Sequence, residues 1–175
     1  VVKLGAGPEL TGCFCYSSHM PPSASPPGAT GSSDGLKAIL DFLRSHATFD
    51  RMQDAHLDYL ARRLRLGYYA AGEIIAAPEQ GAARHLFIIK QGRVRGEFAG
   101  NGEPEDGDVW ELVEGECFPI GALLAQRPVR GVQRAAEDTF CLELPAADFE
   151  RLLDICPVFH DFCTRRLANL LEQSK

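Results

Sequence analysis

The chain has 175 residues, of which 45% are hydrophobic, and a formal net charge of −6. This length allows one well-buried core but not two full domains beside an irregular tail. The acidic balance argues against nucleic-acid and anionic-membrane binding, and no apolar run approaches the roughly 20 residues that cross a bilayer. The six cysteines show no disulfide-framework spacing, which favours a reducing, cytoplasmic setting.

The N-terminal segment differs in composition from the rest. Residues 1–35 are rich in Gly, Pro and Ser and show no periodicity, so we expect a disordered leader or linker there. The triplet Ser18-His19-Met20 resembles an expression-vector remnant, which suggests that part of this leader is vector-derived. The domain is then expected at 36–175, with N-terminal helices at 36–66, a β-roll at 67–145 and C-terminal helices at 146–175.

Helical periodicity flanks the centre of the chain on both sides. Apolar residues at helical spacing predict two short N-terminal helices, with Asp34 and Asp54 as their N-caps. Two C-terminal amphipathic helices are expected over 147–153 and 157–171. The apolar positions of the first two helices are Leu36, Ile39, Leu40 and Leu43, then Leu57, Leu60, Ala61 and Leu64.

The centre reads as short strands separated by glycine-containing turns. Seven stretches have strand character: 68–69, 73–76, 85–90, 93–98, 109–113, 132–135 and 140–144. Many short strands at regular spacing predict an all-β sandwich or barrel of roughly eight strands between the helices. The acidic run at 103–108 lacks the regular oxygen spacing of a calcium loop, so a solvated hairpin tip is expected there.

The stretch 115–132 stands out within this β region. It indicates a strand end, a tight turn, one short helical turn, and an arginine-bearing loop that enters the next strand. Free backbone N–H groups at a helix N-terminus beside guanidinium groups favour anion binding. A phosphate-bearing small molecule is therefore the expected ligand.

Several motifs in order resemble the cyclic-nucleotide-binding domains of the cAMP-receptor and protein-kinase-A regulatory type. They are Tyr69–Ile75, His85–Val94, Gly115–Phe118, the run Ala122-Leu123-Leu124, Arg127-Pro128 and Arg134–Thr139. The resemblance covers about 36–172 and implies a mainly β jelly roll (a double-stranded β-helix) with flanking helices and a pocket inside the roll. It also implies C-terminal helices that move or dimerise with ligand state.

The resemblance implies a set of ligand-binding residues and a ligand class. The residues are Phe118, Pro119, Ile120, Gly121, Ala122, Leu123, Arg127, Arg130, Gly131 and Val132. The implied ligand is cAMP, cGMP or another adenine or guanine nucleotide, with no cofactor or metal.

The stretch 115–132, called the cassette from here on, departs from the pattern of the resembled family at three positions. Family members usually carry Phe-Gly-Glu, whose Glu accepts a hydrogen bond from the ribose 2′-hydroxyl; here Pro119 and Ile120 stand at the Gly and Glu positions. The second arginine, Arg130, comes one residue late. This variant resembles a bacterial subgroup in which the domain precedes a pair of CBS domains and a putative nucleotidyltransferase.

Two functional hypotheses follow. The first is a non-enzymatic regulatory module, a fragment of a larger bacterial signalling protein, that binds a nucleotide and signals through its C-terminal helices to downstream domains or a homodimer partner. The second is a degenerate fold kept for dimerisation or interdomain contact. Cys156, His160 and Cys163 have a helical spacing that zinc could use, but packing in the interior is the favoured interpretation.

Overall fold

The computed structural model describes residues 33–98 and 109–172. The segments expected to form most of the leader and the acidic hairpin tip lie outside these residues. Helices α1 (Ser33–Arg44) and α2 (Asp54–Ala61) come first, and α4 (Ala146–Ile155) and α5 (Pro157–Glu172) come last. Between them lie eight strands, the 3-10 helix η1 (Pro78–Gln80) and the short helix α3 (Ile120–Leu124).

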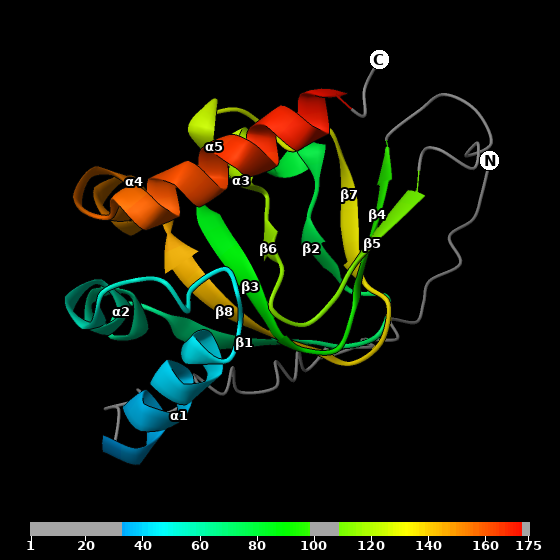
Figure 1. Cartoon of the computed structure of the whole chain (residues 1–175). Helices are drawn as coiled ribbons and strands as arrows, with labels where there is room; N and C mark the ends of the chain where they lie inside the picture. Colours follow the sequence, from blue (N-terminus) through cyan, green and yellow to red (C-terminus); the bar gives the residue numbers. More distant parts are fainter. Residues whose placement is uncertain (1–32, 99–108, 173–175) are drawn as a thin grey trace, which may run out of the picture. The chain divides into compact units, whose positions relative to one another are not determined.

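The strands form two four-stranded antiparallel sheets. One sheet has the order β1-β8-β3-β6 and the other β2-β7-β4-β5, and the ribbon shows them facing each other as a roll (Figure 1). This arrangement confirms the predicted jelly roll with flanking helices. The strands are β1 (Arg65–Tyr69), β2 (Ile74–Ala76), β3 (His85–Gln91), β4 (Val94–Phe98), β5 (Val109–Leu112), β6 (Cys117–Phe118), β7 (Gly131–Ala135) and β8 (Thr139–Pro145).

Strand β3 explains how the helices attach to the roll. Its four consecutive residues Leu86, Phe87, Ile88 and Ile89 are all buried, because each face of this sheet is covered. Leu86 and Ile88 pack in a core with the helices, whereas Phe87 and Ile89 pack between the two sheets. The side chains of a strand alternate between its faces, so one short apolar run supports both cores.

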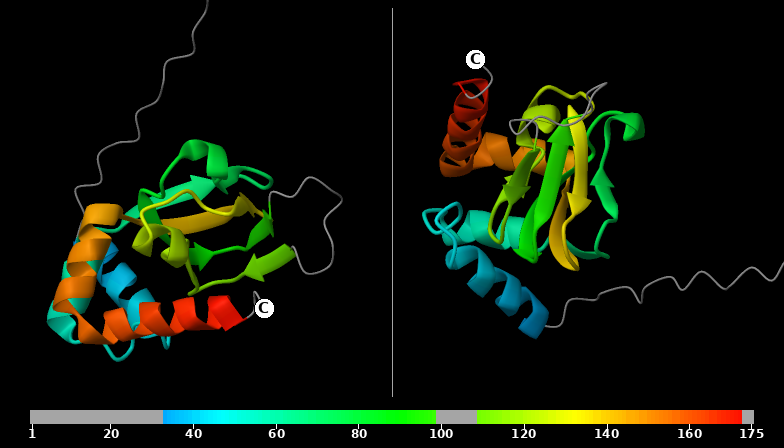
Figure 2. Two further views of the ribbon diagram at one scale, coloured as in Figure 1. Left: turned by 90° about the horizontal axis from the view of Figure 1, so that it is seen from above. Right: turned by 90° about the vertical axis from the view of Figure 1, so that its right-hand side faces the viewer.

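Helices α1, α2, α4 and α5 gather on one side of the roll (Figure 2). Leu43 from α1, Leu57 and Leu60 from α2, and Phe149 and Leu152 from α4 are buried together there. This shared core confirms the apolar stripes expected for the two N-terminal helices. Helix α5 continues from this cluster and packs against α3, so the last helix lies beside the cassette (Figure 1).

The N-terminal helix starts differ from the predicted caps. Helix α1 begins at Ser33, so Asp34 lies in its first turn and the helix overlaps the end of the expected leader. The N-cap of α2 is Gln53, and Asp54 is the first helical residue. Asp54 forms an ion pair with Arg44 at 2.8 Å, and its charge stabilises the positive end of the helix dipole without capping it.

Candidate functional site

A cavity of about 570 Å³ opens where the cassette meets α5 and the β4–β5 edge of the roll. Its volume lies within the range of small-molecule sites, about 300–1,000 Å³. Its walls come from β4–β7, α3, the loop after α3, and α5. The lining residues are Phe98, Trp110, Glu111, Leu112, Glu116, Cys117, Phe118, Pro119, Ile120, Gly121, Ala122, Arg127, Val129, Arg130, Gly131, Gln133, Arg166 and Leu167.

The cassette follows the path expected from the sequence. Strand β6 leads into α3, whose N-cap is Pro119, and a loop then enters β7. The Arg127 N–H donates to the Ala122 carbonyl at 3.0 Å, and the Arg127 carbonyl accepts from the Ala83 N–H at 3.1 Å. These bonds fix the start of the arginine-bearing loop against α3 on one side and the segment before β3 on the other.

Eight of the ten predicted ligand residues line this cavity, and Leu123 and Val132 do not. Leu123 is 4% exposed and belongs to the core shared with the helices. Val132 is half-buried on β7, between the buried residues Gly131 and Gln133. Because side chains alternate across a strand, Val132 faces away from the interior that its two neighbours share.

Three arginines line the cavity, and Arg166 is the one that is paired with a carboxylate, Glu116. Arg127 and Arg130 both line it, and neither takes part in an ion pair among residues 33–98 and 109–172. The Arg130 guanidinium carbon lies 5.9 Å from the centre of the Phe98 ring, close enough for a cation–π contact. Within the described part of the chain, their donors are therefore available to a phosphate group.

The departures from the family pattern have clear structural consequences. Ile120 is 3% exposed and packs in the helix-side core while also lining the cavity. It offers no acceptor to a ribose hydroxyl. Gly131 has no room for a side chain, because a Cβ atom there would overlap the Glu97 carbonyl oxygen. The loop thus enters β7 through a glycine held tightly against β4.

Helix α5 forms part of the cavity wall. Leu167 Cδ1 would lie 3.6 Å from a Cβ atom built on Gly121, so α5 covers the cassette at van der Waals distance. Arg166 Nη2 donates to Glu116 Oε1 at 3.3 Å and joins the helix to the turn before β6. Helix α5 thus lines the cavity through Arg166 and Leu167.

Sequence reasoning missed Trp110 and Gln133 as cavity residues. Trp110 lies over Gly96, where a Cβ atom would overlap the indole ring, and its ring centre is 4.8 Å from that of Phe98. Gln133 is paired with the same glycine from the other side, on β7. The glycine at position 96, inside an expected strand, indicates that another group approaches the backbone closely there. Which residues approach it depends on the register of the sheet, and the sequence does not give that register.

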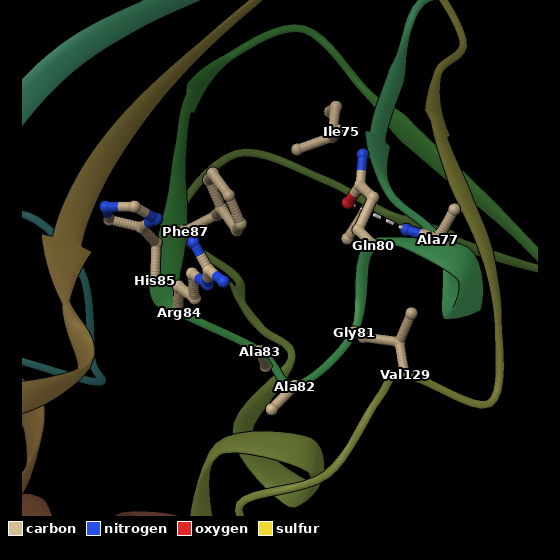
Figure 3. Close-up of a pocket in the computed structure, with 11 residues that line it drawn as sticks. Ile75, Ala77, Gln80, Gly81, Ala82, Ala83, Arg84, His85, Phe87 and Val129 are labelled. Carbon is tan, nitrogen blue, oxygen red and sulfur yellow. Dashed lines mark hydrogen bonds between the residues drawn. The ribbon is translucent and has the colours of Figure 1, made fainter.

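A second, smaller cavity of about 150 Å³ lies beside η1 and the start of β3 (Figure 3). It is lined by Gln80, Arg84 and His85 among others, and Val129 lines both cavities. The Gln80 side-chain oxygen accepts from the Ala77 N–H at 3.1 Å, so this acceptor is already used by the protein. Its volume is below the usual range for a nucleotide-sized ligand.

The four cysteines of the described residues behave as buried apolar residues. Burial raises the pKa of the Cys117 thiol far above its usual range, and it raises that of Cys163 to about 12, so both remain neutral thiols. Cys156 and Cys163 are buried, whereas His160 is exposed. The side chains of this spacing therefore do not converge, and no cluster of three metal-binding side chains occurs in the described part of the chain.

The comparisons with known proteins agree with this architecture. The family model described as "Cyclic nucleotide-binding domain" matches residues 66–156. No curated protein matches the chain. Within the described residues, no helix is long and apolar enough to cross a membrane.

Solved structures share the fold at low sequence identity. The regulatory domain of Toxoplasma gondii PKA with cAMP has a TM-score of 0.68 and 20% identity, over 78% of this chain and 51% of that one. The Thermus thermophilus catabolite activator protein has a TM-score of 0.62 and 22% identity, over 73% of this chain and 59% of that one. The regulatory subunit of a cAMP-independent protein kinase A from Trypanosoma brucei has a TM-score of 0.66 and 19% identity, over 76% of this chain and 47% of that one. This chain therefore spans about half to three-fifths of the length of these proteins.

Proposed function

The chain belongs to the cyclic nucleotide-binding domain family, and on that premise we propose that it is a regulatory module that binds a cyclic nucleotide or a related phosphate-bearing nucleotide. The ligand occupies the large cavity. Its phosphate contacts Arg127 or Arg130 and the free N–H groups at the start of α3. Occupancy is relayed through the C-terminal helices.

One observation carries this proposal: the cassette and two arginines line the same cavity of about 570 Å³, which is large enough for a nucleotide. Among the described residues, neither of these arginines has an ion-pair partner. Cations held near a hydrogen-bonding backbone favour a phosphate over a neutral ligand. The apolar walls, such as Phe98 and Leu112, favour a ligand with a flat ring at its other end.

The relay rests on α5, which supplies Arg166 and Leu167 to the cavity wall. A ligand that contacts these residues favours one placement of the helix over others. The size of the response equals the difference in ligand affinity between the two placements. The output reaches downstream domains of a longer chain or a second copy bound through the C-terminal helices.

The nucleotide itself is left to experiment, with cAMP, cGMP and other adenine or guanine nucleotides as candidates. Several structural neighbours are complexes with cAMP, which supports cAMP as the first compound to try. One neighbour is described as cAMP-independent, and Ile120 removes the usual ribose acceptor here, which supports a wider panel.

The proposal also covers the longer protein to which this module belongs. The variant cassette around Pro119 and Ile120 supports a bacterial, cytoplasmic signalling protein in which CBS domains and a nucleotidyltransferase-like domain follow this module. The module has no enzymatic activity of its own in this account. Cys117 is a nucleophile type that lines the cavity, and burial raises the pKa of its thiol, which keeps it neutral and unreactive.

The alternative is a degenerate, non-binding fold used for dimerisation or interdomain contact. The burial of Ile120 at the position of the missing carboxylate is the observation that favours it. In that case no nucleotide binds, and the apolar faces of the terminal helices make the functional contact.

Thermal unfolding separates the two functions. The protein is scanned with cAMP, cGMP, cyclic dinucleotides, AMP, ADP and ATP at millimolar concentration. A ligand present at about 100 times its Kd stabilises the folded state by about 2.7 kcal/mol, which shifts the midpoint by several degrees. If none of these nucleotides raises the midpoint, the sensor function fails and the interaction function is left.

A further inference from the structure

Gln133 carries a buried polar atom without a partner. Its side chain is 7% exposed, and its Oε1 atom accepts no hydrogen bond among the described residues. Buried acceptors in folded proteins are almost always paired, and leaving one unpaired costs about 1–3 kcal/mol. Gln133 lines the ligand-sized cavity, and an unpaired acceptor on a cavity-lining residue indicates that its partner arrives with the ligand.

The position of Gln133 in the sheet places this acceptor beside an aromatic surface. Gln133 on β7 is opposite Gly96 on β4, and Gly96 is opposite Trp110 on β5. Gln133 and Gly96 are both buried, while the neighbouring Arg95 and Arg134 are exposed, so this row faces the interior of the roll. Because Gly96 has no side chain, the Trp110 indole extends over it. Gln133 and Trp110, on either side of this glycine, both line the cavity.

The smaller cavity offers an internal comparison. There Gln80 also lines the space, yet its Oε1 accepts the Ala77 N–H (Figure 3). In these two cavities, the acceptor of Gln80 is used by the protein and that of Gln133 has no partner among the described residues. The unpaired one lies in the cavity with the arginines.

We infer that Gln133 Oε1 accepts a hydrogen bond from a donor group of the bound nucleotide, next to a base that stacks on Trp110. This inference rests on the proposed function and adds the recognition step that the cassette lacks. Ile120 cannot accept a hydrogen bond, whereas Gln133 supplies an acceptor in the same cavity. The donor is either the exocyclic amine of the base or a ribose hydroxyl, and a glutamine amide is well suited to an adenine amine.

The test combines one variant with two ligand analogues. Gln133→Leu removes the acceptor at similar volume, and because the unpaired polar group is lost, the apo midpoint should stay the same or rise. Affinity for cAMP should fall about 5- to 100-fold, measured by titration calorimetry. If cAMP does not bind but AMP does, the same measurement uses AMP. Gln53→Leu is the matched control, because Gln53 is exposed and lies outside the cavity-lining set.

The two ligand analogues identify the donor group of the nucleotide. This measurement uses the unmodified protein, so it does not require that Gln133→Leu folds. On the unmodified protein, the purine-riboside analogue lacks the exocyclic amine and the 2′-deoxy analogue lacks the ribose hydroxyl. The analogue that lacks the true donor should bind about as weakly as the parent nucleotide binds to Gln133→Leu, and the variant should weaken it no further.

The outcomes separate the two claims. Parent-nucleotide affinity that is unchanged in Gln133→Leu overturns this inference but leaves the proposed function intact. If the variant does not fold, equal affinity of the unmodified protein for the parent and both analogues overturns it in the same way. If no nucleotide binds the unmodified protein at all, the proposed function fails and this inference falls with it.

Discussion

The two cavities that share Val129 differ in what their polar groups are doing. Beside η1, the space is about 150 Å³ and its glutamine acceptor is taken by a backbone N–H. Beside α5, the space is about 570 Å³ and holds two arginines without ion-pair partners among the described residues, together with an unpaired buried acceptor. Arg84 lines the smaller space, also without an ion-pair partner among the described residues, but that space is smaller than a nucleotide site and its glutamine acceptor is already used. The larger space retains donors and acceptors that a ligand can use.

The largest expected effect comes from restoring the family's carboxylate. Ile120→Glu should lower the unfolding free energy of the apo protein by about 3 kcal/mol or more, because it removes a buried apolar side chain and introduces a charge next to the core. Urea denaturation measures this loss. The same variant should show a larger midpoint shift with cAMP than the unmodified protein, since the ribose hydroxyl then has an acceptor.

Ile120→Leu is the control, and a swap of similar volume should cost less than about 1.5 kcal/mol. Equal stability of Ile120→Glu and the unmodified protein would mean that position 120 is not packed as the structure has it.

A pair of arginine variants tests the difference between the cavities directly. Arg130→Ala should weaken nucleotide binding about 10- to 100-fold, because a hydrogen bond to a charged group contributes about 1.5–3 kcal/mol. Arg84→Ala removes an arginine from the lining of the smaller cavity and should leave the affinity unchanged. Calorimetry with the same nucleotide compares them. Equal losses of affinity in both variants would indicate a general effect of the protein's charge. A loss of affinity in Arg84→Ala alone would indicate that the nucleotide binds in the smaller cavity.

The smallest effect is expected at the link between α5 and the cassette. Arg166 and Glu116 are each about a third exposed, at 36% and 35% of their side chains, so solvent screens their attraction. Arg166→Gln should therefore change the unfolding free energy by less than about 1 kcal/mol. Hydrogen exchange of α5 should show less ligand-induced protection than in the unmodified protein. A loss above about 2 kcal/mol would indicate that the pair has a structural role beyond this link.

The fold and the cassette could be predicted from sequence because both depend on local pattern. The run Leu86–Ile89, the turn glycines and the short helix at 120–124 occur where periodicity and motif order indicated. Trp110, Gln133 and Arg166 could not be predicted as cavity residues. They lie on different elements, and only the sheet register and the packing of α5 bring them to the same space. Leu123 was assigned to the site because it lies inside the motif, yet its side chain points into the core.

The emission of Trp110 gives the most direct test of the claim that the larger cavity holds the nucleotide. Trp110 is the only tryptophan of the chain and lines that cavity, so a base stacked against it should change its fluorescence. Titration with cAMP, or with whichever nucleotide raises the unfolding midpoint, should give a saturable change in emission that is weakened in Arg130→Ala. A nucleotide that stabilises the protein while leaving the emission of Trp110 unchanged would contradict the account.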